Sequence, residues 1–464
     1  MLLRTTRLDT LARPSGLLAL SAALLAGAIM DTLGFFGPGA LAMATAAAVL
    51  ALVAVLRARK GLAQRPETGD GTRNVLRILV AIFLAYDLVK VGRSLPALVV
   101  LAAGVVLLAL EWRAGAAASR GAPERARLWL WCACAAALAV LQVRARDGSF
   151  IDVWVFQQEA SAAVLRGQNP YSITYPNIYK DMRFYGEAVA DASRVRAFPY
   201  PPQTIFGNLP AFVLLKDVRY AMLAALLVAG WAMARIAPAG VGNLAAAAVL
   251  FHPGTPRLLL SAWTEPTVLA LFLLLVLAVR RLLVAPPRGW VAAGVAGALV
   301  AGAKQYTPLL LAPFLAALPA GGRLRVVALA AAVAVAAAAP FVLWDPAGFW
   351  NGVVAMQFRQ PFRPDALSWP AALVRLGFTQ PSGLWGFLLT AAIVASCWPR
   401  RGSLAQAVTC GAVAFVVFLL TAKQAFLNYY WLADGLLLAA AVLQLGDERV
   451  AACARQPEVT SKSS

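Results

Sequence analysis

Long apolar runs separated by short polar turns repeat along almost the whole chain of 464 residues. Each run favours a membrane-spanning helix, because a helix of about 20 apolar residues crosses the hydrocarbon core of a bilayer. We expect helical segments at 16–36, 39–56, 75–92, 95–111, 128–143, 204–216, 219–236, 241–258, 264–279, 289–303, 305–318, 325–343, 382–398, 404–421 and 427–445. The pattern predicts an all-α polytopic membrane protein, a bundle of roughly 13–15 membrane segments.

Two polar intervals, residues 144–203 and 344–381, interrupt this pattern. Their mixture of aromatic and polar residues predicts large loops, and the longer loop is expected to carry interfacial helices. The intervals divide the chain into a four-span N-terminal extension at 1–127, a core at 128–445 and a tail at 446–464.

Basic residues predict the side on which each loop lies, because cytoplasmic loops carry an excess of Lys and Arg. Short basic turns put both termini and the tail in the cytoplasm, and the two long loops on the outer face. The residues counted for the cytoplasmic side are Arg4, Arg7, Arg13, Arg57, Arg59, Lys60, Arg65, Arg73, Arg113, Arg120, Arg125, Arg127, Arg280, Arg281, Arg288, Arg323, Arg325, Arg400 and Arg401. Successive spans cross the membrane in alternating directions, and the positions of the basic turns leave one segment too many between 204 and 258. One segment there is therefore expected to be re-entrant or interfacial, with breaks at "PYPP" or "FHPGTP".

Composition excludes a soluble protein and a nucleic-acid partner. Hydrophobic residues make up 61% of the chain, charged residues only 13%, and the mean hydropathy is +0.73. A soluble surface needs about 25–35% charged residues. The net charge of +20 comes from arginines in short turns rather than from a basic stripe with interleaved aromatics. We therefore expect an integral protein of a bacterial-type plasma membrane, surrounded by lipid.

The longer polar interval opens with an acid in front of a helical pattern, "IDVWVFQQEASAAVLRGQNPY" at 151–171. Apolar residues recur at helical spacing from Trp154 to Leu165, and Gly167 ends the pattern. A helix N-terminus stabilises an ionised carboxylate, which suits Asp152 to act as a general base. The alternative is a helix cap on a surface helix. Asp147 is the second candidate base, although a solvated turn residue is its plainer interpretation.

Basic and polar residues at the outer ends of other segments are candidates for binding a phosphate or a sugar. Arg359 and Arg363 lie in "FRQPFRPDALSW", where they bind phosphate or pair with Asp365. Lys304 stands at a broken helix end, where it meets a lipid phosphate or extends to the interface.

Three further candidates come from the last segments. Lys423, Asn428 and Tyr429 in "KQAFLNYYW" line a headgroup or sugar site, or form part of an interfacial belt. His252, the single histidine, is a weaker candidate for the same site, and Glu265 is interpreted first as a helix cap. The five cysteines show no metal-ligand spacing, and no metal or cofactor is expected.

The order of these features resembles the GT-C membrane glycosyltransferases, and most closely family 87, the polyprenyl-phosphate-mannose-dependent α-mannosyltransferases. The resemblance covers roughly residues 128–445. It rests on an acid and short helix before "GQNPY", then "FPYPPQTIFGNLP", "RGWVAAGVAGALVAGAKQYTPLLLAPFL" and "APFVLWDPAGFW". It implies a GT-C-like bundle with Asp152 as catalytic base and Lys304 near the donor phosphate.

The resemblance further implies inverting transfer of a sugar, mannose at family level, from a polyprenyl-phosphate donor to a lipid or glycan acceptor on the outer face. Two other interpretations remain open. A transporter or flippase of lipid-linked saccharides would favour charge pairs near the membrane midplane, for which Asp87 and Lys90 are the only hint. A non-catalytic scaffold would leave the outer acid and basic groups unexplained.

Overall fold

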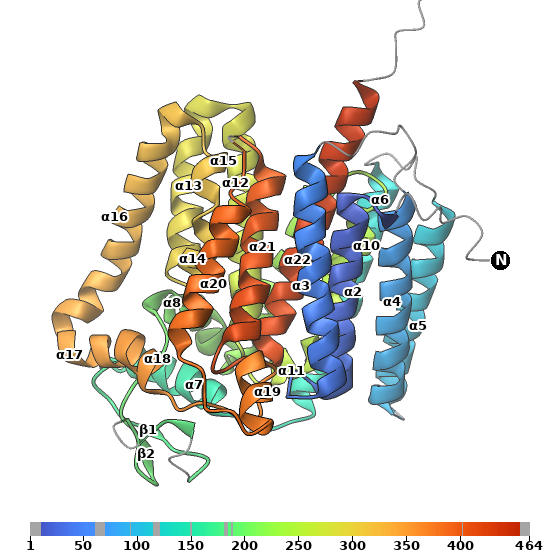
Figure 1. The fold of residues 1–464 in the computed structure, drawn as a ribbon. Coiled ribbons are helices and arrows are strands. Elements are labelled where there is room, and N and C mark those ends of the chain that lie inside the picture. The colour runs from blue at the N-terminus through green and yellow to red at the C-terminus, as the bar shows by residue number, and fades with distance from the viewer. Residues whose placement is uncertain are drawn as a thin grey trace, which may run out of the picture.

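The computed structural model describes residues 11–60, 70–92, 94–114, 121–148, 151–180, 184–186, 189–400 and 402–454. Arg4, Arg7, Arg65, Arg120, Arg401 and the tail beyond residue 454 lie outside the described residues. The described chain is nearly all helical, and eight of its helices are long and apolar enough to cross a membrane. The prediction of an all-α polytopic membrane protein is confirmed at this level (Figure 1).

The N-terminal helices form one side of the bundle. They are α2 (Pro14–Thr32), α3 (Pro38–Arg59), α4 (Asp70–Val91), α5 (Leu95–Arg113) and α6 (Ala122–Arg144). A proline in the first turn begins four of them, α2, α3, α5 and α6, where the missing N–H would have no partner in any case. Helix α2 packs between α3 and α22, so the N-terminal extension is joined directly to the C-terminal end of the core.

The remaining elements follow in the order α7 (Asp152–Leu165), β1 (Tyr175–Pro176), β2 (Arg194–Val195), α8 (Pro202–Leu215), α9 (Arg219–Ile236), α10 (Gly242–Leu250), α11 (Thr255–Leu260), α12 (Glu265–Val284), α13 (Pro286–Ala301), α14 (Thr307–Leu311), α15 (Phe314–Ala317), α16 (Ala320–Trp344), α17 (Pro346–Phe349), the π-helical turn η2 (Trp350–Ala355), α18 (Met356–Arg359), α19 (Trp369–Arg375), α20 (Gly383–Ser396), α21 (Leu404–Thr421) and α22 (Leu427–Cys453). The two short strands pair antiparallel, with Tyr175 opposite Val195.

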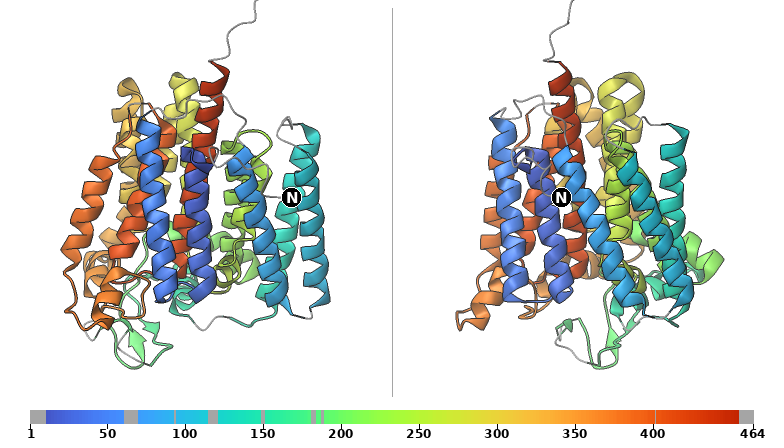
Figure 2. Two further views of the ribbon diagram at one scale, coloured as in Figure 1. Left: turned by 45° about the vertical axis from the view of Figure 1, so that its right-hand side comes forward. Right: turned by 90° about the vertical axis from the view of Figure 1, so that its right-hand side faces the viewer.

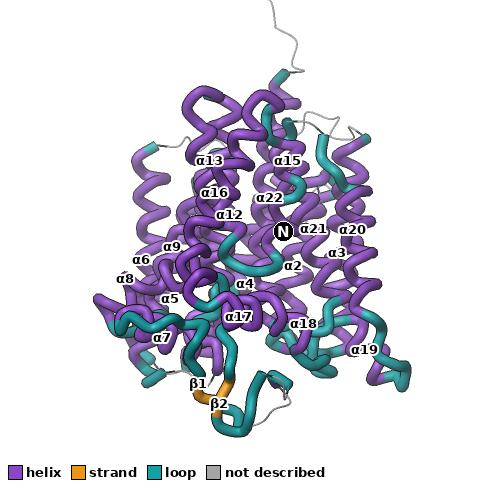
Figure 3. Tube along the Cα trace, turned by 90° about the vertical axis from the view of Figure 1, so that its left-hand side faces the viewer, coloured by secondary structure: helices purple, strands orange, loops and turns teal. Residues whose placement is uncertain are grey.

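The two long polar intervals gather at one end of the bundle, which we call the loop face. Helices α7, α17, α18 and α19 and the β1–β2 pair lie there in every view (Figures 1, 2 and 3). The two loops contact one another, because the Ser172 hydroxyl donates to Asp345 Oδ2 at 2.8 Å. The structure therefore brings together residues that are far apart in the sequence.

Two expected segments are each divided into two helices. The segment 241–258 forms α10 and α11, with the break at His252, Pro253 and Gly254. The segment 305–318 forms α14 and α15, with the break at Ala312 and Pro313, because a proline inside a helix removes a backbone donor. Helix α22 continues past the expected end at 445 to Cys453, where Glu448 accepts hydrogen bonds from Ser15 of α2.

Helix α8 is the segment that breaks the alternation of sides between 204 and 258. Tyr200, just before α8, accepts a hydrogen bond at its carbonyl from Tyr171, and Lys216, just after α8, accepts one from Gln158 of α7. Both ends of α8 therefore lie at the loop face, and Figure 3 shows α8 beside α7. Helix α9 begins on the same face, where Arg219 donates to the carbonyls of Arg146 and Gly148 at 3.1 Å.

A small aromatic core separates the loop face from the main apolar core of the bundle. Its ring contacts include Phe156–Tyr175 at 5.2 Å, Tyr171–Phe198 at 5.5 Å and Tyr171–Phe341 at 5.7 Å between centroids. Aromatic pairs with these spacings stabilise a fixed arrangement beyond the area that they bury. This core holds α7 and the chain around Tyr200 in place, and so positions the candidate site.

Candidate functional site

Asp152 is the first residue of α7. Ile151 before it has extended backbone, and the helix ends before Gly167, whose φ of +71° belongs to the left-handed region that glycine adopts without strain. Val153, Phe156, Ala160 and Ala163 face the protein interior. The predictions that a short helix begins at Asp152 and ends at Gly167 are confirmed.

Both oxygens of the half-buried Asp152 carboxylate accept hydrogen bonds. Oδ1 accepts from the Val153 amide at 2.9 Å and from the Tyr179 hydroxyl at 3.2 Å, and Oδ2 accepts from the Tyr185 hydroxyl at 2.8 Å. A carboxylate can accept about four hydrogen bonds, so capacity remains for one further donor. Burial raises the pKa of Asp152, and the hydrogen bonds from Tyr185 and Tyr179 oppose this shift without cancelling it.

The two tyrosines that hold Asp152 are neutral donors. Burial, followed by the nearby Asp152 carboxylate, raises the pKa of both Tyr179 and Tyr185, so each keeps its hydroxyl proton. Neither tyrosine is among the residues predicted from the sequence. The aromatic stretch that contains them was visible, but no spacing rule connects a helix N-terminus with hydroxyls 27 and 33 residues further along the chain.

A second cluster forms around Lys304, in the turn between α13 and α14. Its ammonium lies 2.5 Å from Oε1 of Glu265, the first residue of α12. Glu265 Oε1 also accepts from Asn428 Nδ2 at 2.9 Å and from the Tyr306 hydroxyl at 3.3 Å. Lys304 is 6% exposed and Glu265 0%, so this is a buried ion pair. The structure thus brings the predicted residues Lys304 and Asn428 together, because both donate to Glu265. The sequence alone favours a helix cap for Glu265.

Three tyrosine rings surround the Lys304 ammonium. It lies 5.3 Å from the centroid of Tyr429, 5.5 Å from Tyr200 and 5.8 Å from Tyr306, within the range of cation–π attraction. Gln305, the next residue, donates to the carbonyls of Pro199 at 2.6 Å and Val353 at 3.0 Å. These bonds fix the turn that carries Lys304 to both long loops.

Tyr200 connects the two clusters. Burial raises its pKa most, and the charges of Asp152 and Glu265 raise it further. Tyr200 therefore lies within the electrostatic reach of both acids. Its ring also belongs to the aromatic core that contains Tyr185, so this core extends from the Asp152 cluster to Lys304.

Arg363 lies beside the Asp152 cluster. It forms a two-point ion pair with Asp365, at 2.8 Å and 2.7 Å, and its guanidinium stacks on Phe184 at 4.7 Å and on Phe426 at 4.9 Å. Phe184 in turn packs on Tyr179, with ring centroids 4.5 Å apart, so Arg363 lies one ring away from a donor to Asp152. The structure shows the pair with Asp365, and phosphate binding by Arg363 stays a prediction.

The other predicted basic residues hold the loop rather than point into either cluster. Lys423 donates to the carbonyls of Phe358 at 3.1 Å and Gln360 at 2.6 Å, and burial lowers its pKa. Arg359 is exposed and donates to Asn351 Oδ1 at 3.3 Å. Lys423 therefore anchors the segment that carries Arg363.

Two predicted residues lie away from both clusters. Asp147 is exposed, in the turn whose neighbouring carbonyls bind Arg219. His252 is buried between α10 and α11. Its Nδ1 accepts from the Gly254 amide at 3.0 Å, and its Nε2 lies 3.5 Å from Asp434 Oδ2. None of these contacts of His252, nor its ring contacts with Phe83 and Trp431, involves Lys304.

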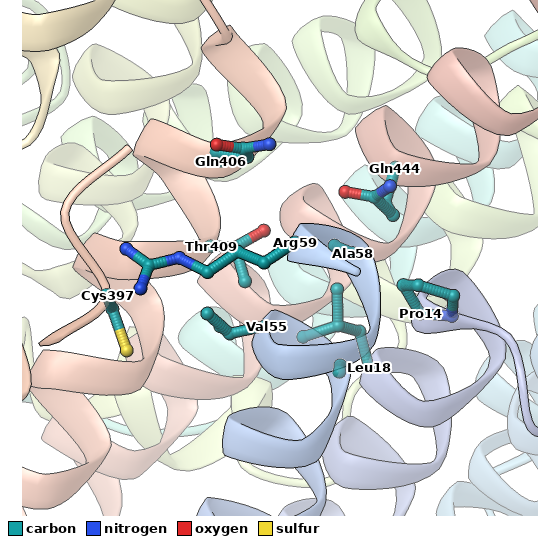
Figure 4. A pocket seen from close by; sticks show the side chains of 10 residues that line it. Pro14, Leu18, Val55, Ala58, Arg59, Cys397, Gln406, Thr409 and Gln444 are labelled. Atoms are coloured by element: carbon teal, nitrogen blue, oxygen red, sulfur yellow. The ribbon is translucent and has the colours of Figure 1, made fainter. Parts of the chain in front are cut away.

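No group of three or more His, Cys, Asp or Glu residues that could hold a metal ion occurs within the described ranges. A pocket lies between α2, α3, α21 and α22, and Figure 4 shows Arg59 reaching across it toward Cys397. Its volume of about 10 Å³ is enough for about one water molecule. This pocket is too small for a sugar, and it shares no lining residue with the two clusters.

Comparison of the chain with models of protein families, with curated proteins and with solved structures gives no significant match.

Proposed function

We propose that the chain is an integral membrane glycosyltransferase. It transfers a sugar, mannose as the first expectation, from a polyprenyl-phosphate-linked donor to a lipid or glycan acceptor on the outer face of the membrane. The loop face would then be the outer face, and both termini would be cytoplasmic. The transfer uses side chains alone and requires no cofactor.

In the proposed step, Asp152 accepts the proton of the acceptor hydroxyl while the oxygen attacks the anomeric carbon. The bond between that carbon and the phosphate oxygen breaks, and its electron pair stays with the phosphate. Attack opposite to the leaving group inverts the anomeric configuration. Lys304 and Arg363 donate hydrogen bonds to the phosphate oxygens and hold the phosphate in place. The products are the glycosylated acceptor, polyprenyl phosphate and a proton on Asp152.

One observation supports this proposal more than any other: one aromatic core contains both Tyr185, which donates to Asp152, and Tyr200, whose ring lies 5.5 Å from the buried Lys304 ammonium. A raised pKa brings a carboxylate closer to the basicity that suits a general base near neutral pH. A cation nearby, but not paired with that acid, is the group that a phosphate leaving group needs. The Asp152 cluster would thus supply the base, and the Lys304 cluster would supply the cation that binds the leaving phosphate.

The test is transfer by the purified full-length chain from a panel of short polyprenyl-phosphate sugars, including mannose, glucose, galactose and arabinose. Release of polyprenyl phosphate that depends on an added lipid or glycan acceptor is the expected result. Asp152→Asn should abolish it, and Asp147→Asn, which changes an exposed acid nearby, should not. Full transfer by Asp152→Asn would reject the assigned base.

A flippase of lipid-linked saccharides, without transferase activity, is the second candidate, and one observation favours it. His252 Nε2 and Asp434 Oδ1 are buried and lack a hydrogen-bond partner among the described residues. Ionisable groups inside a membrane bundle commonly mark a transport path. Translocation of a fluorescent lipid-linked sugar in proteoliposomes, lost in Asp434→Asn but kept in Asp152→Asn, would support this candidate over the transferase.

A further inference from the structure

Glu265 makes contacts that a helix cap does not require. Its side chain accepts no hydrogen bond from the first backbone amides of α12 in the described structure. Its Oε1 instead gathers the Lys304 ammonium, the Asn428 amide and the Tyr306 hydroxyl, while Oε2 has no partner among the described residues. The carboxylate therefore belongs to the Lys304 cluster and determines its charge.

The net charge of this cluster is close to zero. Lys304 contributes one positive charge and Glu265 one negative charge, at 2.5 Å. The other groups that surround the pair are Asn428, Tyr306, Tyr429 and Tyr200, all neutral; burial raises the pKa of Tyr200, which keeps its proton. Arg363, a second cation at the loop face, is likewise paired with an acid, Asp365.

The proposed reaction changes the charge of the phosphate that this cluster would face. The donor is a phosphodiester with one negative charge. When the sugar leaves, the phosphate keeps the electron pair and becomes a monoester, whose second ionisation has a pKa of about 6. At neutral pH the product therefore carries close to two negative charges. A buried site with no net charge accommodates one excess negative charge at a much lower cost than two.

We propose that Glu265 makes the Lys304 cluster select a singly charged phosphodiester over a doubly charged phosphomonoester, and so promotes departure of the product. This inference rests on the proposed function, because only transfer converts one phosphate class into the other. Glu265 acts through Lys304 as a specificity-determining residue and does not touch the reacting atoms.

The test measures the affinity of two probes, farnesyl methyl phosphate as the diester and farnesyl phosphate as the monoester, for the purified full chain at pH 7.5. The native protein should bind the diester more tightly. Glu265→Gln keeps the shape and an acceptor oxygen but removes the charge, and it should strengthen monoester binding roughly tenfold or more, with a smaller change for the diester. The control Glu448→Gln removes a buried carboxylate that binds Ser15, outside both clusters, and should leave the ratio of affinities unchanged.

A second measurement keeps Glu265, and so does not depend on how the Glu265→Gln variant folds. As the pH rises from about 5 to 8, the monoester gains its second charge, and the preference for the diester should grow. The titratable groups facing the pair are Tyr200, Tyr306 and Tyr429, with Asp152 beyond Tyr200. Ionisation of Asp152 would also favour the diester, because a negative charge repels the doubly charged monoester more strongly, so the same titration of Asp152→Asn isolates the effect of the phosphate charge.

The outcomes separate the inference from the function. A native preference that is absent or does not change with pH, or a ratio unaffected by Glu265→Gln while transfer activity is present, overturns the role of Glu265 and leaves the transferase standing. Failure of the native chain to bind either probe or to transfer any sugar overturns the proposed function itself, and the inference with it.

Discussion

Asp152 and Glu265 occupy equivalent local positions and have opposite surroundings. Each is the first residue of a helix, and each accepts three hydrogen bonds from the described residues. The donors to Asp152 are two tyrosine hydroxyls and one amide, all neutral. The donors to Glu265 include the ammonium of Lys304. One acid thus lacks a paired cation and the other has one.

Asp152 can therefore gain or lose a proton, whereas the charge of Glu265 is compensated by the ammonium of Lys304. Hydrogen bonds from neutral donors stabilise a carboxylate without preventing its protonation, and burial favours the protonated form. A buried ion pair is different, because removing either partner leaves an uncompensated charge in a medium of low polarity. The first arrangement suits proton transfer, and the second suits a fixed electrostatic environment.

The largest effect is expected for Asp152→Asn, which removes the proposed base and leaves its hydrogen-bonding shape. Transfer activity should fall by about 100- to 10,000-fold. A carboxyl whose pKa is raised on folding contributes its full stabilisation below the pKa of its unfolded state. That contribution disappears as the pH rises through the folded pKa. At pH 7.5 the variant should therefore melt no lower than the native protein, and a marked fall in melting temperature would contradict this view of Asp152.

Lys304→Met should show the opposite pattern, a large loss of stability. It leaves the Glu265 carboxylate buried beside neutral groups, at a cost of about 3–5 kcal/mol. Adding Glu265→Gln to this variant removes the orphaned charge and should recover much of the loss. Denaturant or thermal unfolding in detergent measures both. If the double variant is no more stable than Lys304→Met, the pair is not coupled as the distances indicate.

Tyr185→Phe tests whether a neutral hydrogen-bond donor helps to set the pKa of Asp152. The Tyr185 hydroxyl lowers the pKa of Asp152, so its loss should raise that pKa further and move the acid limb of the pH–rate profile upward by about one unit. The rate should fall several-fold near pH 6 and little at pH 8. Tyr306→Phe, which removes a hydroxyl from Glu265 instead, is the matched control and should leave the limb where it is.

The smallest effect is expected for Arg363→Lys. The pair with Asp365 is partly exposed, so its loss should change stability by about 1 kcal/mol or less. Lysine keeps the charge and loses both the two-point geometry and the stacking on Phe184 and Phe426. We expect a KM for the donor a few-fold higher with kcat nearly unchanged. A loss as large as that of Asp152→Asn would show that Arg363 does more than bind phosphate.

Local features of the fold followed from the sequence, and contacts between distant segments did not. The helix from Asp152 to Gly167 and the break at "FHPGTP" were predictable, because apolar spacing, glycine and proline act on their immediate neighbours. The extra segment between 204 and 258 was expected from the basic turns, but identifying it as α8 required its contacts with α7. The assignment of Lys304 to a phosphate site stays a prediction.

Within the site, the missing information was tertiary. Glu265 looked like a cap because its position in α12 is a cap position, and its real partners come from a turn and from the last helix. His252 and Asp147 are polar residues at plausible positions along the chain, yet the fold directs them elsewhere. Hydrophobic periodicity predicts helices, but it does not predict which polar side chains at the ends of different helices contact one another.

The chain separations within the two clusters set an order in which a ribosome completes them. The tyrosines that hold Asp152 follow it by 27 and 33 residues, so the whole set is synthesised before α8. Lys304 follows Glu265 by 39 residues, whereas Asn428, on the final helix, follows it by 163. Insertion of α22 therefore completes the charged cluster, and a nascent chain arrested before it would contain all the residues of the Asp152 cluster and an ion pair that still lacks Asn428 and Tyr429.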